Sequence, residues 1–180
     1  MPNREVVYRN LDSPLGEMIA GTLPEGVCFL EWHDRGGVPR ILERVAKRYR
    51  CTLTEGNHPH LDHLEKELKL YFEGTLHRFA VPVAIHGTAF ERRTWDLLLD
   101  IPYGETRSYG DLARLLGKPG ASRAVGRANG ANYLSIVVPC HRVIESTGGL
   151  RGYGGGLWRK KQLLELEAKH ACERPQFSPQ

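Results

Sequence analysis

The sequence lacks the features that mark several large protein classes. Its apolar runs extend over only a few residues, far short of the roughly 20 that a membrane-spanning helix needs. Its first five residues, Met-Pro-Asn-Arg-Glu, do not show the charged-then-apolar pattern of a secretion signal. The chain also contains no internal repeat and no low-complexity tract. We therefore expect a globular protein of the cytoplasm (or of the nucleus, in a eukaryote) with no membrane partner.

Cysteine is scarce as well. The four cysteines, Cys28, Cys51, Cys140 and Cys172, lie far apart, and no two are spaced as CxxC. This spacing argues against a disulfide framework and against a four-cysteine zinc site. We therefore expect the protein to occupy a reducing compartment and to have at least one free thiol.

Three histidines leave one metal site to consider. His58, His60 and His63 lie close together in sequence with Asp62, and imidazoles and carboxylates are suitable metal ligands. Their spacing matches no established metal motif, and it crosses a predicted boundary between a loop and a helix. We therefore predict no metal and no cofactor, with metal binding by these histidines as the open alternative.

Positive charge is concentrated in the second half of the chain. Residues 1–85 hold 11 Lys and Arg against 12 Asp and Glu, whereas residues 86–180 hold 14 against 9. Between Leu112 and Leu164 there are nine Lys and Arg and a single acid, Glu145. Such a stretch is typical of a surface that binds a polyanion, although a solvated basic face is the alternative.

Residues 1–85 are predicted to form a small α/β domain. The expected strands are Val6–Leu11, Gly16–Thr22 and Val27–Trp32, separated by turns that contain proline and glycine. One helix is expected to begin near Pro39 and continue to Tyr49, and another to carry Leu61, Leu64, Leu68 and Tyr71 on one stripe. Residues 73–87 are the expected link.

Residues 86–172 are predicted to be mainly helical, with a loose tail at 173–180. Thr88 and Glu91 form a capping box, and Ser108 is expected to cap a short helix. After a turn at 117–120, Ser122 is expected to cap a third helix that continues to about Ala131. These two short helices indicate a helix-turn-helix. A last helix is expected over Leu157–Lys169.

The segment with the strongest chemical signal begins at Ser135. Ile136–Val138 is an apolar run consistent with a buried strand, and Pro139 then turns the chain. Cys140 and His141 follow, the residue types of a thiolate nucleophile and its base. In an extended strand these neighbours would point to opposite faces, so either the backbone bends or a water molecule carries the proton.

Glu167 strengthens this interpretation. It follows Leu163 by four residues and Leu164 by three, which places it on the apolar stripe of the last helix. A carboxylate on an inner face needs a partner, and a histidine is a natural one. The alternative is that Glu167 turns to the rim of the helix and is solvated.

Pro139-Cys-His-Arg-Val-Ile144 resembles the active-site signature of the O6-alkylguanine-DNA alkyltransferases. Four further segments resemble the same family over roughly residues 86–170, namely Arg123–Asn132, Gly152–Leu157, Lys160–Glu167 and Ile101–Tyr109. The resemblance is to the stand-alone repair form. It implies an α+β fold, in which a small sheet domain with flanking helices in a ribonuclease-H-like layout precedes a mainly helical winged helix-turn-helix domain.

The resemblance also implies a function and roles for the site residues. The family repairs DNA by direct reversal: an alkyl group moves irreversibly from O6-alkylguanine, or from O4-alkylthymine, to a cysteine, here Cys140. His141 and Glu167 would activate Cys140 through water. Asn132 would brace the turn beside it, and Tyr109 would donate a proton to the departing guanine.

The same resemblance implies a DNA interface. Arg123 would fill the gap that the flipped nucleotide leaves. The other DNA-contacting residues would be Ser122, Ala124 and Arg127. The base would be held by the carbonyls of Cys140 and Val143 and by the backbone near Tyr153 and Gly154. Alkylated DNA is the expected partner of a monomer that needs no other protein and no cofactor.

Two other functions stay open. A DNA-binding module of the same fold would recognise a lesion without transferring its alkyl group. A cysteine–histidine hydrolase would act on esters or peptides, but it would need an oxyanion hole and repeated turnover, and it would not explain the basic helix-turn-helix.

Overall fold

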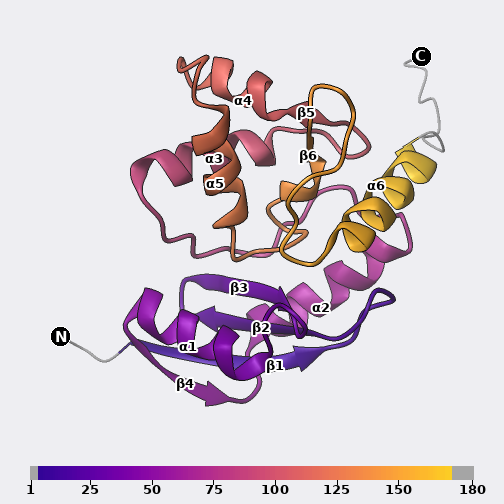
Figure 1. Cartoon of the computed structure of the whole chain (residues 1–180). Coiled ribbons are helices and arrows are strands. Elements are labelled where there is room, and N and C mark those ends of the chain that lie inside the picture. The colour runs from indigo at the N-terminus through magenta and orange to yellow at the C-terminus, as the bar shows by residue number, and fades with distance from the viewer. Residues whose placement is uncertain (1–3, 172–180) are drawn as a thin grey trace, which may run out of the picture.

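A four-stranded sheet forms the lower layer of the computed structural model, which describes residues 4–171 (Figure 1). Cys172 and the predicted tail at 173–180 lie outside the described residues. The strands are β1 (Arg4–Leu11), β2 (Met18–Leu23), β3 (Gly26–Trp32) and β4 (Cys51–Glu55), in the order β3-β2-β1-β4. The first three are antiparallel neighbours, and β4 pairs with β1 in parallel.

The three predicted strands agree with β1, β2 and β3 to within two residues at each end. No comparable pattern of residues predicts β4. None of its five residues is fully buried, and only Cys51 and Leu53 are even half-buried. A short edge strand of this kind obtains its hydrogen bonds from its neighbour rather than from a strong apolar pattern.

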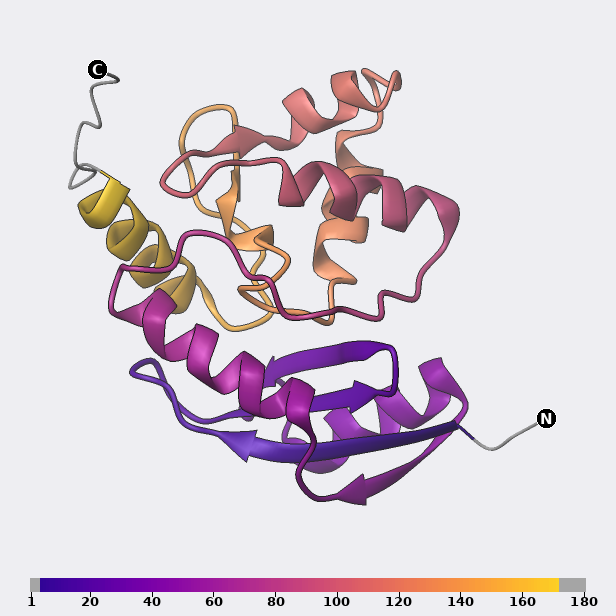
Figure 2. The same ribbon diagram turned by 180° about the vertical axis from the view of Figure 1, so that it is seen from behind.

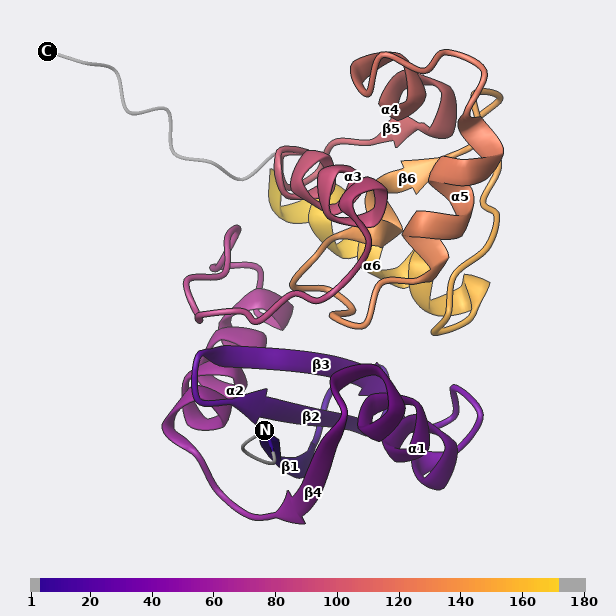
Figure 3. The same ribbon diagram turned by 90° about the vertical axis from the view of Figure 1, so that its left-hand side faces the viewer.

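Two helices cover opposite faces of the sheet (Figures 2 and 3). Helix α1 (Val38–Tyr49) packs Ile41 and Val45 against one face. Helix α2 (Pro59–Phe72) packs its predicted stripe of Leu61, Leu64, Leu68 and Tyr71 against the other. Alternate residues of a strand point to opposite faces, which is how Met18 reaches the α2 side and Ile19 the α1 side.

The second half contains four α-helices and a small parallel pair of strands. They are α3 (Ala89–Leu99), β5 (Arg107–Ser108), α4 (Tyr109–Leu115), α5 (Ser122–Gly130), the 3-10 helix η1 (Cys140–Arg142), β6 (Val143–Ile144) and α6 (Leu157–Ala171). The capping box of Thr88 and Glu91 is present, and Ser108 forms a second one with Asp111. These caps satisfy helix N–H groups that would otherwise lack partners.

Two local predictions were wrong. Ser122 does not cap α5: it is the first residue of the helix, and Ala121 occupies the cap position without a side-chain bond. The reason is that Ala121 N–H donates to the Lys118 carbonyl, so the preceding turn runs directly into the helix. Ile136–Val138 is buried but is not a strand, because the chain turns there and Ile136 has a φ of 70°.

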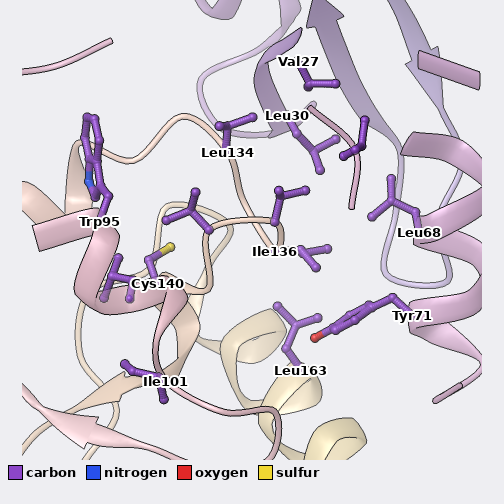
Figure 4. Packing of buried hydrophobic residues seen from close by; sticks show 14 of the residues in the cluster. Val27, Leu30, Leu68, Tyr71, Trp95, Ile101, Leu134, Ile136, Cys140 and Leu163 are labelled. Atoms are coloured by element: carbon purple, nitrogen blue, oxygen red, sulfur yellow. The ribbon is translucent and has the colours of Figure 1, made fainter. Parts of the chain in front are cut away.

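One hydrophobic core joins the two halves. Figure 4 shows Leu30 and Leu68 from the first half packed towards Leu134, Ile136 and Leu163 from the second. The backbone joins them too, because the open edge of β3 receives two later segments. Residues 82–84 of the predicted link bond to Val27, and residues 133–135 bond to Leu30.

The tryptophans are divided between interior and surface. Trp32 and Trp95 lie in the core, whereas Trp158 is 54% exposed. None of the helices found within residues 4–171 is long and apolar enough to cross a membrane.

Candidate active site

The turn that precedes the cysteine is held by Asn132. Its side-chain nitrogen donates to the Val138 carbonyl at 2.9 Å, and its side-chain oxygen accepts from Leu134 N–H at 2.9 Å. Leu30 N–H of β3 also donates to the Tyr133 carbonyl at 2.7 Å. These bonds explain why the apolar run after Asn132 turns instead of extending, and they tie the turn before Pro139 and Cys140 to the edge of the sheet.

Cys140 begins the 3-10 helix η1. Successive side chains in a 3-10 helix are about a third of a turn apart, so Cys140 and His141 do not point to opposite faces as they would in a strand. The backbone therefore bends at Cys140, which is the first of the two alternatives that the sequence left open. Cys140 is buried, with 6% of its surface exposed, and Asn129 donates to its carbonyl at 3.3 Å.

His141, the next residue in the chain, is fully buried, and Glu167 orients its ring. Its Nε2 is 2.7 Å from Glu167 Oε1, and neither side chain has exposed surface. An ionised carboxylate can only accept hydrogen bonds, so Nε2 carries the proton and Nδ1 carries the lone pair. Among the described residues, Nδ1 has no hydrogen-bond partner. Burial lowers the pKa of His141, which keeps the ring neutral and able to accept a proton.

Glu167 has further partners that fix it as an anion. The Arg142 guanidinium donates to both carboxylate oxygens, through Nε at 2.8 Å and Nη2 at 3.0 Å. The Tyr71 hydroxyl donates at 2.7 Å, and Gly104 N–H donates at 3.2 Å. Burial alone would raise the pKa of Glu167, but His141 and Arg142 together hold it well below its usual value. The carboxylate is therefore ionised at neutral pH, with Arg142 as its counter-charge.

Arg142, the residue after His141, directs its positive charge away from the thiol. Its guanidinium donates to Glu167 and to the Ile101 carbonyl. Burial raises the pKa of Cys140, and the opposing influences come from Asn132, Arg35 and Lys160. At neutral pH the sulfur is therefore a thiol that needs a base.

A pocket of about 630 Å³ opens between α5 and the glycine-rich loop of residues 152–156. Its lining residues are Arg35, Tyr109, Ser122, Arg123, Gly126, Gly130, Glu145, Arg151, Gly152, Tyr153 and Gly154. The Tyr109 hydroxyl donates to the Arg151 carbonyl at 3.0 Å, and the Lys160 ammonium donates to the same oxygen at 2.9 Å. Side chains from α4 and α5 and backbone from residues 151–154 thus line the pocket together.

The predicted site residues fall into two groups. Cys140, His141, Glu167 and Asn132 lie together in the interior, and Tyr109, Ser122, Arg123, Tyr153 and Gly154 line the pocket. Arg127 is exposed on α5 and Ala124 is half-buried, and neither of them lines the pocket. Val143 is fully buried, and its carbonyl accepts a hydrogen bond from Lys160.

The sequence interpretation missed an ion pair from the first half of the chain. Arg35 donates to both oxygens of Glu31, at 2.7 and 2.9 Å, and also to the carbonyls of Asn132 and Gly130. Glu31 is 1% exposed, and burial raises its pKa to about 7 in spite of Arg35. One signal was available: Glu31 is the single charged residue of an apolar strand, with Arg35 four positions later.

The three histidines considered for metal binding have other contacts. His58 accepts from His60 N–H and so caps α2, His60 lies 3.2 Å from the Pro24 carbonyl, and His63 pairs with Glu67. Across residues 4–171, no group of three histidine, cysteine or acidic side chains is arranged to hold a metal ion. Cys28, Cys51 and Cys140 are free thiols.

Known proteins resemble the chain along most of its length. Residues 89–169 match the family described as 6-O-methylguanine DNA methyltransferase, DNA binding domain. The methylated-DNA–protein-cysteine methyltransferase of Mycolicibacterium paratuberculosis is 44% identical over 92% of this chain and 94% of its own length. The protein of that name from Methanosarcina acetivorans is 49% identical over 89% and 97%.

Solved structures show the same similarity. The crystal structure of the Mycobacterium tuberculosis O6-methylguanine methyltransferase superposes with a TM-score of 0.79 at 42% identity, covering 95% of this chain and 96% of that one. A structure of the Mycobacterium tuberculosis protein in complex with DNA gives a TM-score of 0.78 at 42% identity, covering 91% and 94%.

Proposed function

The chain belongs to the family of methylated-DNA–protein-cysteine methyltransferases, and we propose that Cys140 is the cysteine that accepts the alkyl group. The protein repairs DNA by transferring an alkyl group from a damaged base to one of its own cysteines. The observation that carries the assignment to Cys140 is its burial next to the His141–Glu167 pair. Cys140 does not itself line the pocket, but it lies close enough to interact electrostatically with Arg35, Tyr109 and Tyr153, which do. The other two described cysteines, Cys28 and Cys51, belong to the N-terminal sheet.

The proposed reaction is an in-line displacement at carbon. His141 Nδ1 takes the thiol proton through a water molecule, and Glu167 stabilises the resulting imidazolium. The sulfur attacks the alkyl carbon, so that a C–S bond forms as the bond between that carbon and guanine O6 breaks. The purine leaves with the electron pair and gains one proton, which Tyr109 supplies. Burial raises the pKa of Tyr109, so its hydroxyl is protonated at neutral pH.

The product explains why each molecule reacts once. A thioether does not hydrolyse under mild conditions, and regeneration would need a second thiol beside the first. Within the described part of the chain, Cys140 is the only cysteine next to the pocket, since Cys28 and Cys51 lie in β3 and β4. We therefore propose one alkyl group per molecule and no cofactor.

DNA recognition is proposed to use the α4–turn–α5 unit as a helix-turn-helix, with β5 and β6 as its wing. The damaged base is extruded into the pocket, because O6 is stacked and paired inside a duplex. Arg123, exposed at the start of α5 and lining the pocket, is suitably placed to fill the vacated space. We also propose that the N-terminal half has a ribonuclease-H-like layout. O4-alkylthymine is proposed as a second substrate. The protein is proposed to act as a monomer without an obligatory protein partner.

The decisive experiment measures intact mass after incubation with an oligonucleotide that carries one O6-methylguanine. We expect a gain of one methyl group per protein, mapped by peptide mass to Cys140. Cys140→Ala should gain nothing and still bind DNA, whereas Cys51→Ala, the matched thiol control, should gain the methyl group as the wild type does.

Each rival function has its own outcome in this experiment. Folded protein with a reduced thiol that binds the lesion and gains no mass would favour the lesion-binding module. Product that keeps accumulating beyond one equivalent would favour the hydrolase. Methylation at a cysteine other than Cys140 would contradict the assignment of the acceptor.

A further inference from the structure

The loop that lines one side of the pocket has little structure of its own. Between Gly152 and Gly156, four of the five residues are glycine, with Tyr153 as the exception. One backbone hydrogen bond closes the loop, from Gly156 N–H to the Tyr153 carbonyl at 2.9 Å. Glycine loses more conformational freedom on ordering than any other residue, so groups outside the loop must hold it in one conformation.

Arg159, in the first turn of α6, is such a group. Its Nη1 donates to the Gly155 carbonyl at 2.8 Å and to Asp34 Oδ1 at 2.7 Å. Its Nε donates to the Leu15 carbonyl at 2.9 Å. Leu15 and Asp34 belong to the N-terminal half of the protein. One guanidinium therefore joins the Gly152–Gly156 loop to two loops of the N-terminal half.

The guanidinium also packs against two aromatic rings. Its central carbon lies 4.4 Å from the centre of the Trp32 ring and 4.5 Å from that of Trp158, and Arg159 is 5% exposed. The surroundings leave little room for displacement. A Cβ on Gly155 would lie 2.4 Å from the Trp32 ring, and one on Gly16 would lie 2.9 Å from Arg159 Nη2. The planar shape and several donors of arginine suit this position, and lysine has neither.

We infer that Arg159 is a positioning residue for alkyl transfer, which fixes the Gly152–Gly156 loop in the conformation that receives the flipped base. The inference rests on the proposed function of the pocket. It assigns to the N-terminal half an indirect part in the reaction, because the anchors of Arg159 are Leu15, Trp32 and Asp34. Recognition by backbone atoms tolerates little error: a displacement of about 1 Å can cost roughly 100-fold in rate.

The test compares single-turnover kinetics of wild type and Arg159→Ala over a range of concentrations of O6-methylguanine DNA. We expect the limiting transfer rate to fall by about 10- to 100-fold, while the DNA affinity stays within about twofold. Alkylation of Cys140 by iodoacetamide, followed by peptide mass, should keep its wild-type rate because that small reagent does not use the loop. Rates are expressed per reactive site from an end-point titration, so a lower folded fraction does not imitate the effect.

Two milder variants keep the test open if Arg159→Ala does not fold. Arg159→Lys retains the charge and one donor direction, so it should recover part of the lost rate. Asp34→Asn changes a side chain that is 64% exposed and should slow transfer by a smaller factor. Arg9→Ala is the matched control, because Arg9 also joins several partners, Asn57, Asp62 and Glu65, but does not contact the loop. It should transfer at the wild-type rate.

The outcomes separate this inference from the function on which it rests. If wild-type protein transfers no alkyl group, the proposed function fails. If wild type transfers and the Arg159 and Asp34 variants match it per reactive site, the inference fails and Arg159 only stabilises the fold. An equal loss of transfer and of iodoacetamide reactivity would also overturn it, because the effect would then lie at Cys140 itself.

Discussion

His141 Nε2 lies 2.7 Å from Glu167 Oε1 at a position where neither side chain has exposed surface. The carboxylate already has a positive partner in Arg142, so the histidine can stay neutral and present Nδ1 as a base. This contact therefore does two things: it selects the tautomer of His141, and it prepares the site for the positive charge that forms when His141 takes a proton.

Glu167→Gln should lower both stability and transfer. The amide keeps the size of the side chain but leaves the Arg142 guanidinium buried without its counter-charge. Loss of one partner of a buried pair costs about 3–5 kcal/mol of unfolding free energy. Urea unfolding and single-turnover transfer measure the two effects. Glu165→Gln on the exposed side of α6 should stay within about 0.5 kcal/mol of wild type. Wild-type transfer by Glu167→Gln would show that His141 needs no orienting carboxylate.

Glu31 should make stability depend on pH in an unusual direction. Its pKa is raised from 4.5 to about 7, so between these values the folded protein binds more protons than the unfolded chain. The unfolding free energy of wild type minus that of Glu31→Gln should therefore fall as pH rises from about 4.5 to 7, by on the order of 3 kcal/mol. Urea unfolding at several pH values measures this difference. A difference that grows with pH would mean that Arg35 outweighs burial.

Arg123→Ala should distinguish base extrusion from chemistry. Without the side chain that fills the vacated space, transfer from duplex DNA should slow more than transfer from free O6-methylguanine, because the free base needs no extrusion. Parallel single-turnover assays with both substrates give the ratio. Arg92→Ala, which removes the same charge from an exposed position on α3, should leave the ratio unchanged. An equal slowing on both substrates would assign Arg123 a role in the pocket instead.

Tyr109→Phe should slow transfer mainly at the chemical step. The variant removes the hydroxyl that faces the pocket and donates to the Arg151 carbonyl. Loss of a proton donor lowers the limiting rate by about 100-fold or more, with little change in DNA affinity. Tyr133→Phe, outside the pocket, is the control. If DNA affinity falls and the limiting rate does not, Tyr109 contacts the DNA backbone rather than the departing base.

Residues with a local pattern were predictable. The three-residue spacing of Thr88 and Glu91 predicts the start of a helix. Glu167 lies on the apolar stripe of α6, which the helical spacing of the leucines identifies. Cys140 and His141 are neighbours in the chain. In each case the relevant contact depends on a few residues close in sequence, or on one helix whose inner face can be identified.

Features that depend on distant partners were not predictable in the same way. The apolar character of Ile136 predicts burial, but its turn conformation depends on the Asn132 amide and on the edge of β3. Arg35 and Tyr71 reach the site from the first half of the chain, and no sequence spacing relates them to Cys140 or Glu167. Among the strands of residues 4–171, β4 pairs only with β1.

The pairing of β3 with residues 133–135 has a consequence for attempts to divide the protein. A fragment that ends near residue 85 keeps the sheet but has no nucleophile. A fragment that begins near 86 keeps Cys140 but loses the strand edge that supports its turn, together with Tyr71 and Arg35. Neither piece contains a whole site. Mixed together, the two fragments should regain activity only as they associate, so that alkyl transfer would serve as a direct reporter of fragment complementation.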